Sequence, residues 1–188
     1  RPGDLPTDLE IREALQRLVT VETLREDASD ACVRYAALET LLEPLESIHQ
    51  PRHSHPEGDV LYHSLQVYEL IRQQQPYDID LQLAALLHDV GKGIDPADHV
   101  AAGLAVLEGL ISERTAWLIE HHLEARRRRE GTLGARAARR LRNHECYEEL
   151  DLLCVCDRDG RVSGAMVPEL DEALVTIREL EESMGDVP

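Results

Sequence analysis

Apolar residues recur at helical spacing along this chain, and this limits the folds open to it more than any other feature. The stretch 30–42 is a clear case, because Val33, Ala36, Ala37 and Leu41 would share one face of a helix. No stretch shows the apolar–polar alternation of a half-buried strand or the turn signal of a hairpin. Phe is absent and aromatic residues make up 3% of the chain, so Leu, Val, Ile and Ala must build the core. Ala and Leu favour helix, and we predict an all-α fold.

The predicted elements form one helical bundle. Helices are expected over residues 8–18, 30–42, 59–71, 81–90, 99–111, 113–123, 135–142, 148–156 and 169–182. The arginine-rich stretch 126–134 is expected to be a solvated connection. With 188 residues and no linker or repeat, we predict a single domain. Within it we expect an N-terminal helical segment (1–54), a central core (55–165) and a C-terminal helix (166–188).

The charge of the chain is strongly acidic but unevenly spread. A formal net charge of −17 disfavours generic binding to nucleic acid or to an anionic membrane. Residues 126–142 are the exception, because they hold eight of the twenty basic residues and one acid, Glu130. This segment either forms a solvated, internally paired surface or recruits a polyanion.

Compartment and membrane signals are weak. The four cysteines show neither a disulfide framework nor zinc-finger spacing, and reduced thiols in the cytoplasm fit best. No stretch approaches the roughly 20 apolar residues of a membrane helix. No signal peptide is visible, although the chain starts at Arg1 rather than Met. We therefore predict a cytoplasmic protein without a membrane partner.

Metal-capable side chains occur in a fixed order along the central segment. They are His63, His88, Asp89, His99, His121, His122 and Asp157. The pair His88-Asp89 ends the apolar run 83–87 and is followed by Gly91-Lys92. Neutral imidazoles and carboxylates are common metal ligands, and burying a lone carboxylate costs several kcal/mol unless a partner compensates. The pattern favours a metal centre.

The ordered set resembles the HD-domain superfamily of metal-dependent phosphohydrolases, including members with an HDxGK word. The resemblance spans about residues 55–165. It implies that His63, His88, Asp89 and Asp157 bind one metal. It further implies a second metal on His99 and His121, with Asp89 bridging, within a helical bundle of the HD-domain type.

This resemblance implies a hydrolytic reaction. Ligands of nitrogen and oxygen suit one or two divalent ions of Fe, Mn, Zn, Co or Mg. A metal-activated water would attack a phosphate ester, with Asp89 at the metal and Lys92 neutralising phosphate oxygens. The expected substrate is small, phosphorylated and nucleotide-like. Lys92 is otherwise a helix-end cation favoured by the helix dipole.

Several assignments stay open at this point. His122 is either a neighbour that orients the ligands or a surface histidine, and Arg126 either meets the substrate or only solvent. Asp159 is an alternative to Asp157. Cys154 and Cys156 are expected to be buried packing thiols. The segment 55–57 either borders the mouth of the site or belongs to an exposed loop.

Two other functions remain in competition. Mixed-valent di-iron oxygenases resemble the same superfamily and use a similar six-ligand set. A non-catalytic or RNA-facing module is the second, because residues 55–109 resemble the HD region of bacterial tRNA nucleotidyltransferases. No nucleotidyl-transfer region is present, and nucleic acid is therefore not the favoured partner. The absence of a Gly-Tyr-Pro word after His122 argues against cyclic-dinucleotide hydrolysis.

Overall fold

The computed structural model describes residues 16–23 and 31–185, and within them it is helical with no strand. Residues 16–23 are helical, while most of the helix predicted over 8–18 lies outside the described residues. The elements that follow are α2 (Ala31–Leu42), the 3-10 helix η1 (Glu43–Ser47), α3 (Val60–Gln74), α4 (Ile79–Leu87), the 3-10 helix η2 (Val90–Gly93), α5 (His99–Leu107), α6 (Glu113–Arg129), α7 (Ala135–Arg142), α8 (Tyr147–Asp159) and α9 (Leu170–Gly185). The prediction of an all-α bundle is confirmed. The division at residues 54 and 165 stays a prediction.

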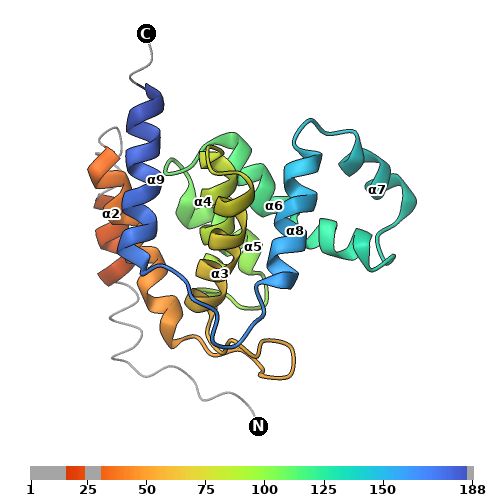
Figure 1. Ribbon diagram of the computed structural model, residues 1–188, viewed down its shortest axis with the longest axis horizontal. Coiled ribbons are helices and arrows are strands. Elements are labelled where there is room, and N and C mark those ends of the chain that lie inside the picture. Colours follow the sequence, from red (N-terminus) through yellow and green to blue (C-terminus); the bar gives the residue numbers. More distant parts are fainter. Residues whose placement is uncertain (1–15, 24–30, 186–188) are drawn as a thin grey trace.

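Four helices, α3, α4, α6 and α8, form the centre of the molecule. α3 packs against α4 and α8, and α6 packs against the same two helices. α4 is apolar nearly all round, with Leu81 to Leu87 buried, because neighbouring helices surround it. At one side α2 and α9 lie against each other, and at the other α7 stands away from the bundle (Figure 1).

Capping side chains fix where the site-bearing helices begin. The Asp59 carboxylate accepts a hydrogen bond from the Tyr62 amide at 2.8 Å and starts α3. The Asp78 carboxylate accepts from the Leu81 amide at 3.0 Å and starts α4. Arg114 grips the same Asp78 with two bonds of 2.6 and 2.7 Å, so the starts of α4 and α6 are tied together.

Two boundaries differ from the sequence-based expectation. α4 ends at Leu87 rather than near residue 90, and η2 continues the chain at a new angle. α6 runs on to Arg129, so the prediction of a solvated connection is wrong for residues 126–129. Arginine is a good helix former, and four cations in the last turn complement the helix dipole.

Candidate metal centre

His63 lies in the first turn of α3, where its imidazole is fully buried between two carboxylates. Its Nε2 is 3.1 Å from Asp157 Oδ1 and its Nδ1 is 3.0 Å from Glu57 Oε1. Burial alone would lower the pKa of His63, but its bonds to Asp157 and Glu57 outweigh burial and raise the pKa to about 9. The protonated ring supplies the positive charge that these buried carboxylates require.

The pair His88-Asp89 sits where α4 gives way to η2. His88 is the C-cap of α4, and its Nδ1 is 2.9 Å from the carbonyl oxygen of Ala85. This bond fixes the ring so that Nε2 points toward Asp89, 3.4 Å from its Oδ2. Because the helix ends here, both side chains face inward, although adjacent residues of a regular helix point about 100° apart.

His99, the first residue of α5, reaches the same carboxylate from the other side. Its Nε2 lies 3.4 Å from Asp89 Oδ1. A very close approach between η2 and α5 holds it there: a Cβ on Gly91 would lie 1.9 Å from the carbonyl oxygen of His99 and 2.6 Å from the Gly103 amide nitrogen. Asp89 is thus placed between His88 and His99.

Of the two adjacent histidines on α6, the structure brings His122 to this cluster. Its ring centroid lies 5.3 Å from that of His88 and 5.6 Å from that of His99. Its Nδ1 bonds the Ile119 carbonyl oxygen at 2.7 Å, an arrangement like that of His88. His121, which the resemblance implied as a ligand, instead lies against Trp117 and places its Nδ1 3.0 Å from Glu124 Oε2.

Asp157 closes the cluster from α8. Besides His63, its Oδ1 accepts a 2.9 Å bond from Arg161 Nη2. The packing of Gly160 against Val67 of α3 brings this end of α8 to His63. Asp159, the alternative to Asp157, is half exposed and pairs with Arg158. Arg126 lies in a hollow of about 270 Å³ that Asp157 also lines.

Lys92 is bound to the edge of the cluster. Its Nζ donates to Asp89 Oδ2 at 2.6 Å and to Gln50 Oε1 at 2.8 Å. An ammonium group has three donor hydrogens and no acceptor, so one hydrogen remains for a further anion. Lys92 therefore touches the metal-capable carboxylate, in addition to lying near a helix end.

The electrostatics of the cluster suit cation binding. Burial would raise the pKa of Asp89, but His88 and Lys92 hold it well below its usual range. Burial and the neighbouring His88 lower the pKa of His122 to about 4, and burial lowers that of His99. The carboxylate is thus ionised and these two imidazoles are neutral at pH 7, as metal ligation requires.

The donor set fits a metal ion on one direct observation. His88 Nε2 and His99 Nε2 are buried and have no hydrogen-bond partner, although both point at Asp89. Buried polar atoms are nearly always satisfied, so an unpaired pair around one carboxylate indicates a missing ligand. The ligand atoms of Asp89, His99 and His122 lie within 4.8 Å of one another, as do those of His63, His88 and Asp89.

Three side chains that the sequence reasoning did not assign to the site take part in it. Glu57 is buried against both His63 and His55, and Gln50 holds Lys92. Arg161 holds Asp157. Of these, only the word His55-Pro56-Glu57 gave a sequence signal. The thiols of Cys154 and Cys156 are buried, as expected, and burial raises the pKa of each to about 11.

Comparison with known proteins agrees with this geometry. A family model described as HD domain matches residues 60–160. The chain belongs to the HD domain family. Two curated relatives are named multifunctional CCA protein: one from Nitrosomonas eutropha is 36% identical over 68 residues, and one from Nitrosococcus oceani is 39% identical over 67. Each match covers 36% of this chain and 16% of the relative, so this HD domain protein resembles a small part of each.

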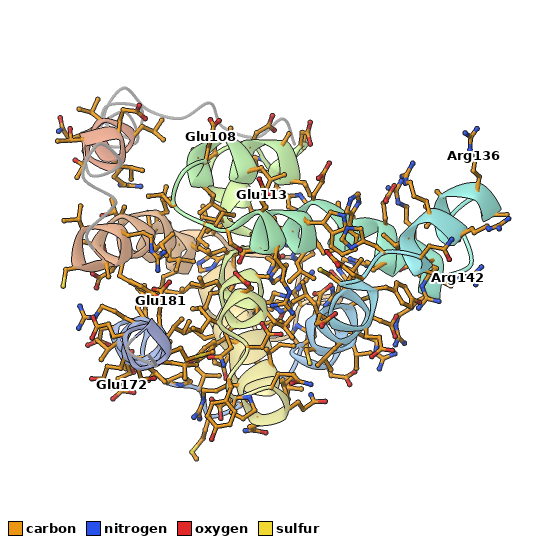
Figure 2. The ribbon with its side chains drawn as sticks, turned by 90° about the horizontal axis from the view of Figure 1, so that it is seen from above. Glu108, Glu113, Arg136, Arg142, Glu172 and Glu181 are labelled. Atoms are coloured by element: carbon orange, nitrogen blue, oxygen red, sulfur yellow. The ribbon has the colours of Figure 1, made fainter. Side chains whose placement is uncertain are left out.

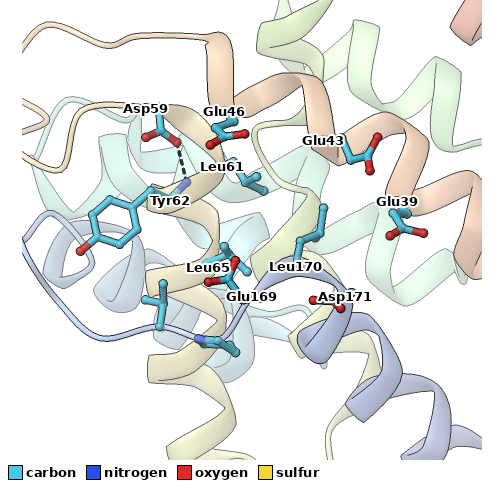
Figure 3. A pocket seen from close by; sticks show the side chains of 12 residues that line it. Glu39, Glu43, Glu46, Asp59, Leu61, Tyr62, Leu65, Glu169, Leu170 and Asp171 are labelled. Atoms are coloured by element: carbon cyan, nitrogen blue, oxygen red, sulfur yellow. Dashed lines mark hydrogen bonds between the residues drawn. The ribbon is translucent and has the colours of Figure 1, made fainter.

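Within the part of the chain that the structure describes, none of the helices combines the length and apolarity that crossing a membrane takes. The largest cavity found there, a groove of about 820 Å³ beside the start of α3, contains none of the metal-capable histidines (Figure 3). Its lining includes six carboxylates, from Glu39, Glu43, Glu46, Asp59, Glu169 and Asp171. The candidate metal centre is therefore separate from this groove.

Proposed function

We propose that this protein is a metal-dependent phosphohydrolase that cleaves a nucleotide or another phosphate ester. The proposed ligands are His63, His88, Asp89, His99, His122 and Asp157, with His122 in place of His121. The observation that carries the proposal is the pair of buried, unpartnered Nε2 atoms of His88 and His99 converging on Asp89. Membership of the HD domain family supports the same chemistry.

A divalent cation held by these residues would polarise a phosphoryl oxygen and lower the pKa of a water molecule toward neutrality. The chain itself supplies the remaining parts. Asp89 lies between His88 and His99, so that it can serve one ion or bridge two. Lys92, anchored by Asp89 and Gln50, offers its third hydrogen to a phosphate oxygen. Cation binding would release the proton of His63, since ligation needs a neutral imidazole.

The test combines metal analysis with hydrolysis. Protein purified without chelator or added metal is expected to contain one or two divalent ions and to hydrolyse p-nitrophenyl phosphate or a nucleotide. His88→Ala and Asp89→Ala should lose both properties, because each removes a group at the centre of the cluster. His53→Ala, in an exposed loop, serves as the control. Unchanged metal content in both site variants would contradict the proposal.

The same experiment addresses the competing oxygenase. Two irons per chain, with oxygen consumption and no phosphate release, would favour a mixed-valent di-iron oxygenase. The names of the two relatives favour a nucleotide or nucleic acid as partner over an unrelated phosphate ester.

A further inference from the structure

Residues 126–142, the end of α6, the following loop and α7, form a segment that we call the arginine arm. It contains eight arginines and one acidic residue, in a chain with 37 acidic and 20 basic residues. A surface that opposes the charge of the whole protein so strongly is informative, because random placement would have mixed the two signs.

Much of this charge has no partner within the protein. Arg126 pairs with Glu130, and Arg128 and Arg129 pair with Asp151. Arg140 lies 3.6 Å from Glu124 but remains 69% exposed. Across residues 16–23 and 31–185, four exposed guanidinium groups of the arm have neither an ion pair nor a hydrogen bond, those of Arg127, Arg136, Arg139 and Arg142. The alternative that these arginines simply pair with the acidic excess is therefore not met for them.

The arm also projects from the protein. α7 packs on α6 and buries Leu141, while its arginines face outward. Figure 2 shows Arg136 and Arg142 on α7 at one end of the molecule, far from the carboxylates Glu172 and Glu181. This placement separates the free cations from the acidic groups that would neutralise them.

The base of the arm lies beside the candidate metal centre. Arg126 follows His122 by four residues on α6, a rise of about 6 Å. Arg126 and Arg129 line the 270 Å³ hollow together with Arg158, Arg161 and Asp157. Arg161 in turn holds Asp157, which contacts His63. Basic side chains thus extend from the edge of the metal cluster to the end of α6, where α7 begins its projection.

We propose that the arginine arm binds the phosphate backbone of a nucleic acid strand and directs its phosphate-bearing end to the metal centre. The second half of this statement rests on the proposed function. Guanidinium groups suit phosphate through paired N–H donors. An anionic membrane is a poorer fit, because none of the large exposed apolar side chains of the described residues lies in the arm, and interfacial helices need such groups.

Binding can be measured without catalysis. The probe is a fluorescently labelled 12-nucleotide single-stranded RNA, titrated with metal-free protein at several salt concentrations. We expect Arg136→Gln/Arg142→Gln to bind about tenfold more weakly and to flatten the slope of log affinity against log salt by about one unit. The matched control is Arg72→Gln/Arg178→Gln, which removes the same charge from α3 and α9, where each arginine pairs within its own helix.

Equal loss of binding in both double variants would reduce the effect to net charge and overturn the proposal. So would failure of the wild type to bind the RNA near 0.1 M salt, or binding of phosphatidylserine vesicles instead. Circular dichroism of each variant checks that its helices persist.

Hydrolysis then tests the link to the metal centre. With metal-loaded protein, the arm variant should raise KM for a 12-mer carrying a 5′- or 3′-terminal phosphate about tenfold more than KM for the matching mononucleotide, because only the longer ligand reaches α7. Equal changes in both KM values would refute the directing role. If no ester is hydrolysed while RNA binding still depends on the arm, the hydrolase proposal fails and the arm remains a nucleic-acid-binding surface.

Discussion

Among single residues, His121 and His122 are adjacent imidazoles that can serve as each other's control. We predict that His122→Ala lowers the metal content of the protein, because its ring faces His88 and His99. His121→Ala should retain the metal, since its ring contacts Trp117 and Glu124. Metal per chain after dialysis is the measurement. The reverse pattern would restore the ligand set that the family resemblance implied.

Lys92 is the residue through which the site can be tested without removing a ligand. We predict that Lys92→Ala slows hydrolysis of a phosphate ester roughly 10²–10³-fold, the usual cost of losing one electrostatic donor to the transition state. Its metal content should persist, because an ammonium group cannot ligate a cation. Wild-type turnover in this variant would leave Lys92 as a helix-end cation. Loss of metal together with turnover would show that it holds Asp89 in place.

The sequence located most residues of the candidate site but not its geometry at two points. It placed His63, His88, Asp89, His99 and Asp157 in one region, and the structure brings them together. It had no means of choosing between His121 and His122, because that choice depends on the rotation of α6 about its axis. Arg161 gave no signal either, since an arginine four residues after an aspartate is common on any helix.

At the scale of elements, the contact between η2 and α5 is the most demanding feature around the site. We predict that Gly91→Ala lowers both the melting temperature and the metal content. The added Cβ would meet backbone atoms of His99 and Gly103, which cannot rotate aside, and overpacking of this kind costs about 1–3 kcal/mol. Gly134→Ala, with no atom within 4 Å of the new Cβ, is the control. Equal melting temperatures would mean that α5 moves without cost.

Element boundaries were predictable where a cap or an apolar run defines them. Asp59 and the spacing of the α3 residues predicted that helix closely. The end of α6 was not predicted, because its stability depends on Asp151 of α8 gripping Arg128 and Arg129. Such a contact joins residues more than twenty positions apart, and no local pattern contains it.

Over the whole molecule, charge is divided between two surfaces of opposite sign. The arginine arm carries free cations, and the groove beside α3 carries six carboxylates. None of these six pairs with a lysine or arginine among the residues that the structure describes. With a net charge of −17, the folded state holds like charges closer together than the unfolded chain does. Repulsion within the groove therefore opposes folding.

This repulsion predicts a salt dependence of stability. The Debye length falls from about 30 Å at 0.01 M to about 8 Å at 0.15 M ionic strength, so the melting temperature should rise over this range. Glu39→Gln/Glu43→Gln removes two like charges four residues apart at the groove edge (Figure 3) and should raise the melting temperature at low salt by about 2 °C, and by less at 0.15 M.

Glu69→Gln/Glu182→Gln changes the net charge equally but removes carboxylates that face Arg72 and Arg178. It should leave the melting temperature unchanged or lower it, because it abolishes attraction rather than repulsion. Thermal scans of both double variants at the two salt concentrations separate local repulsion from net charge. If both variants gain stability equally at low salt, the total charge governs the effect and the clustering of carboxylates in the groove adds nothing to it.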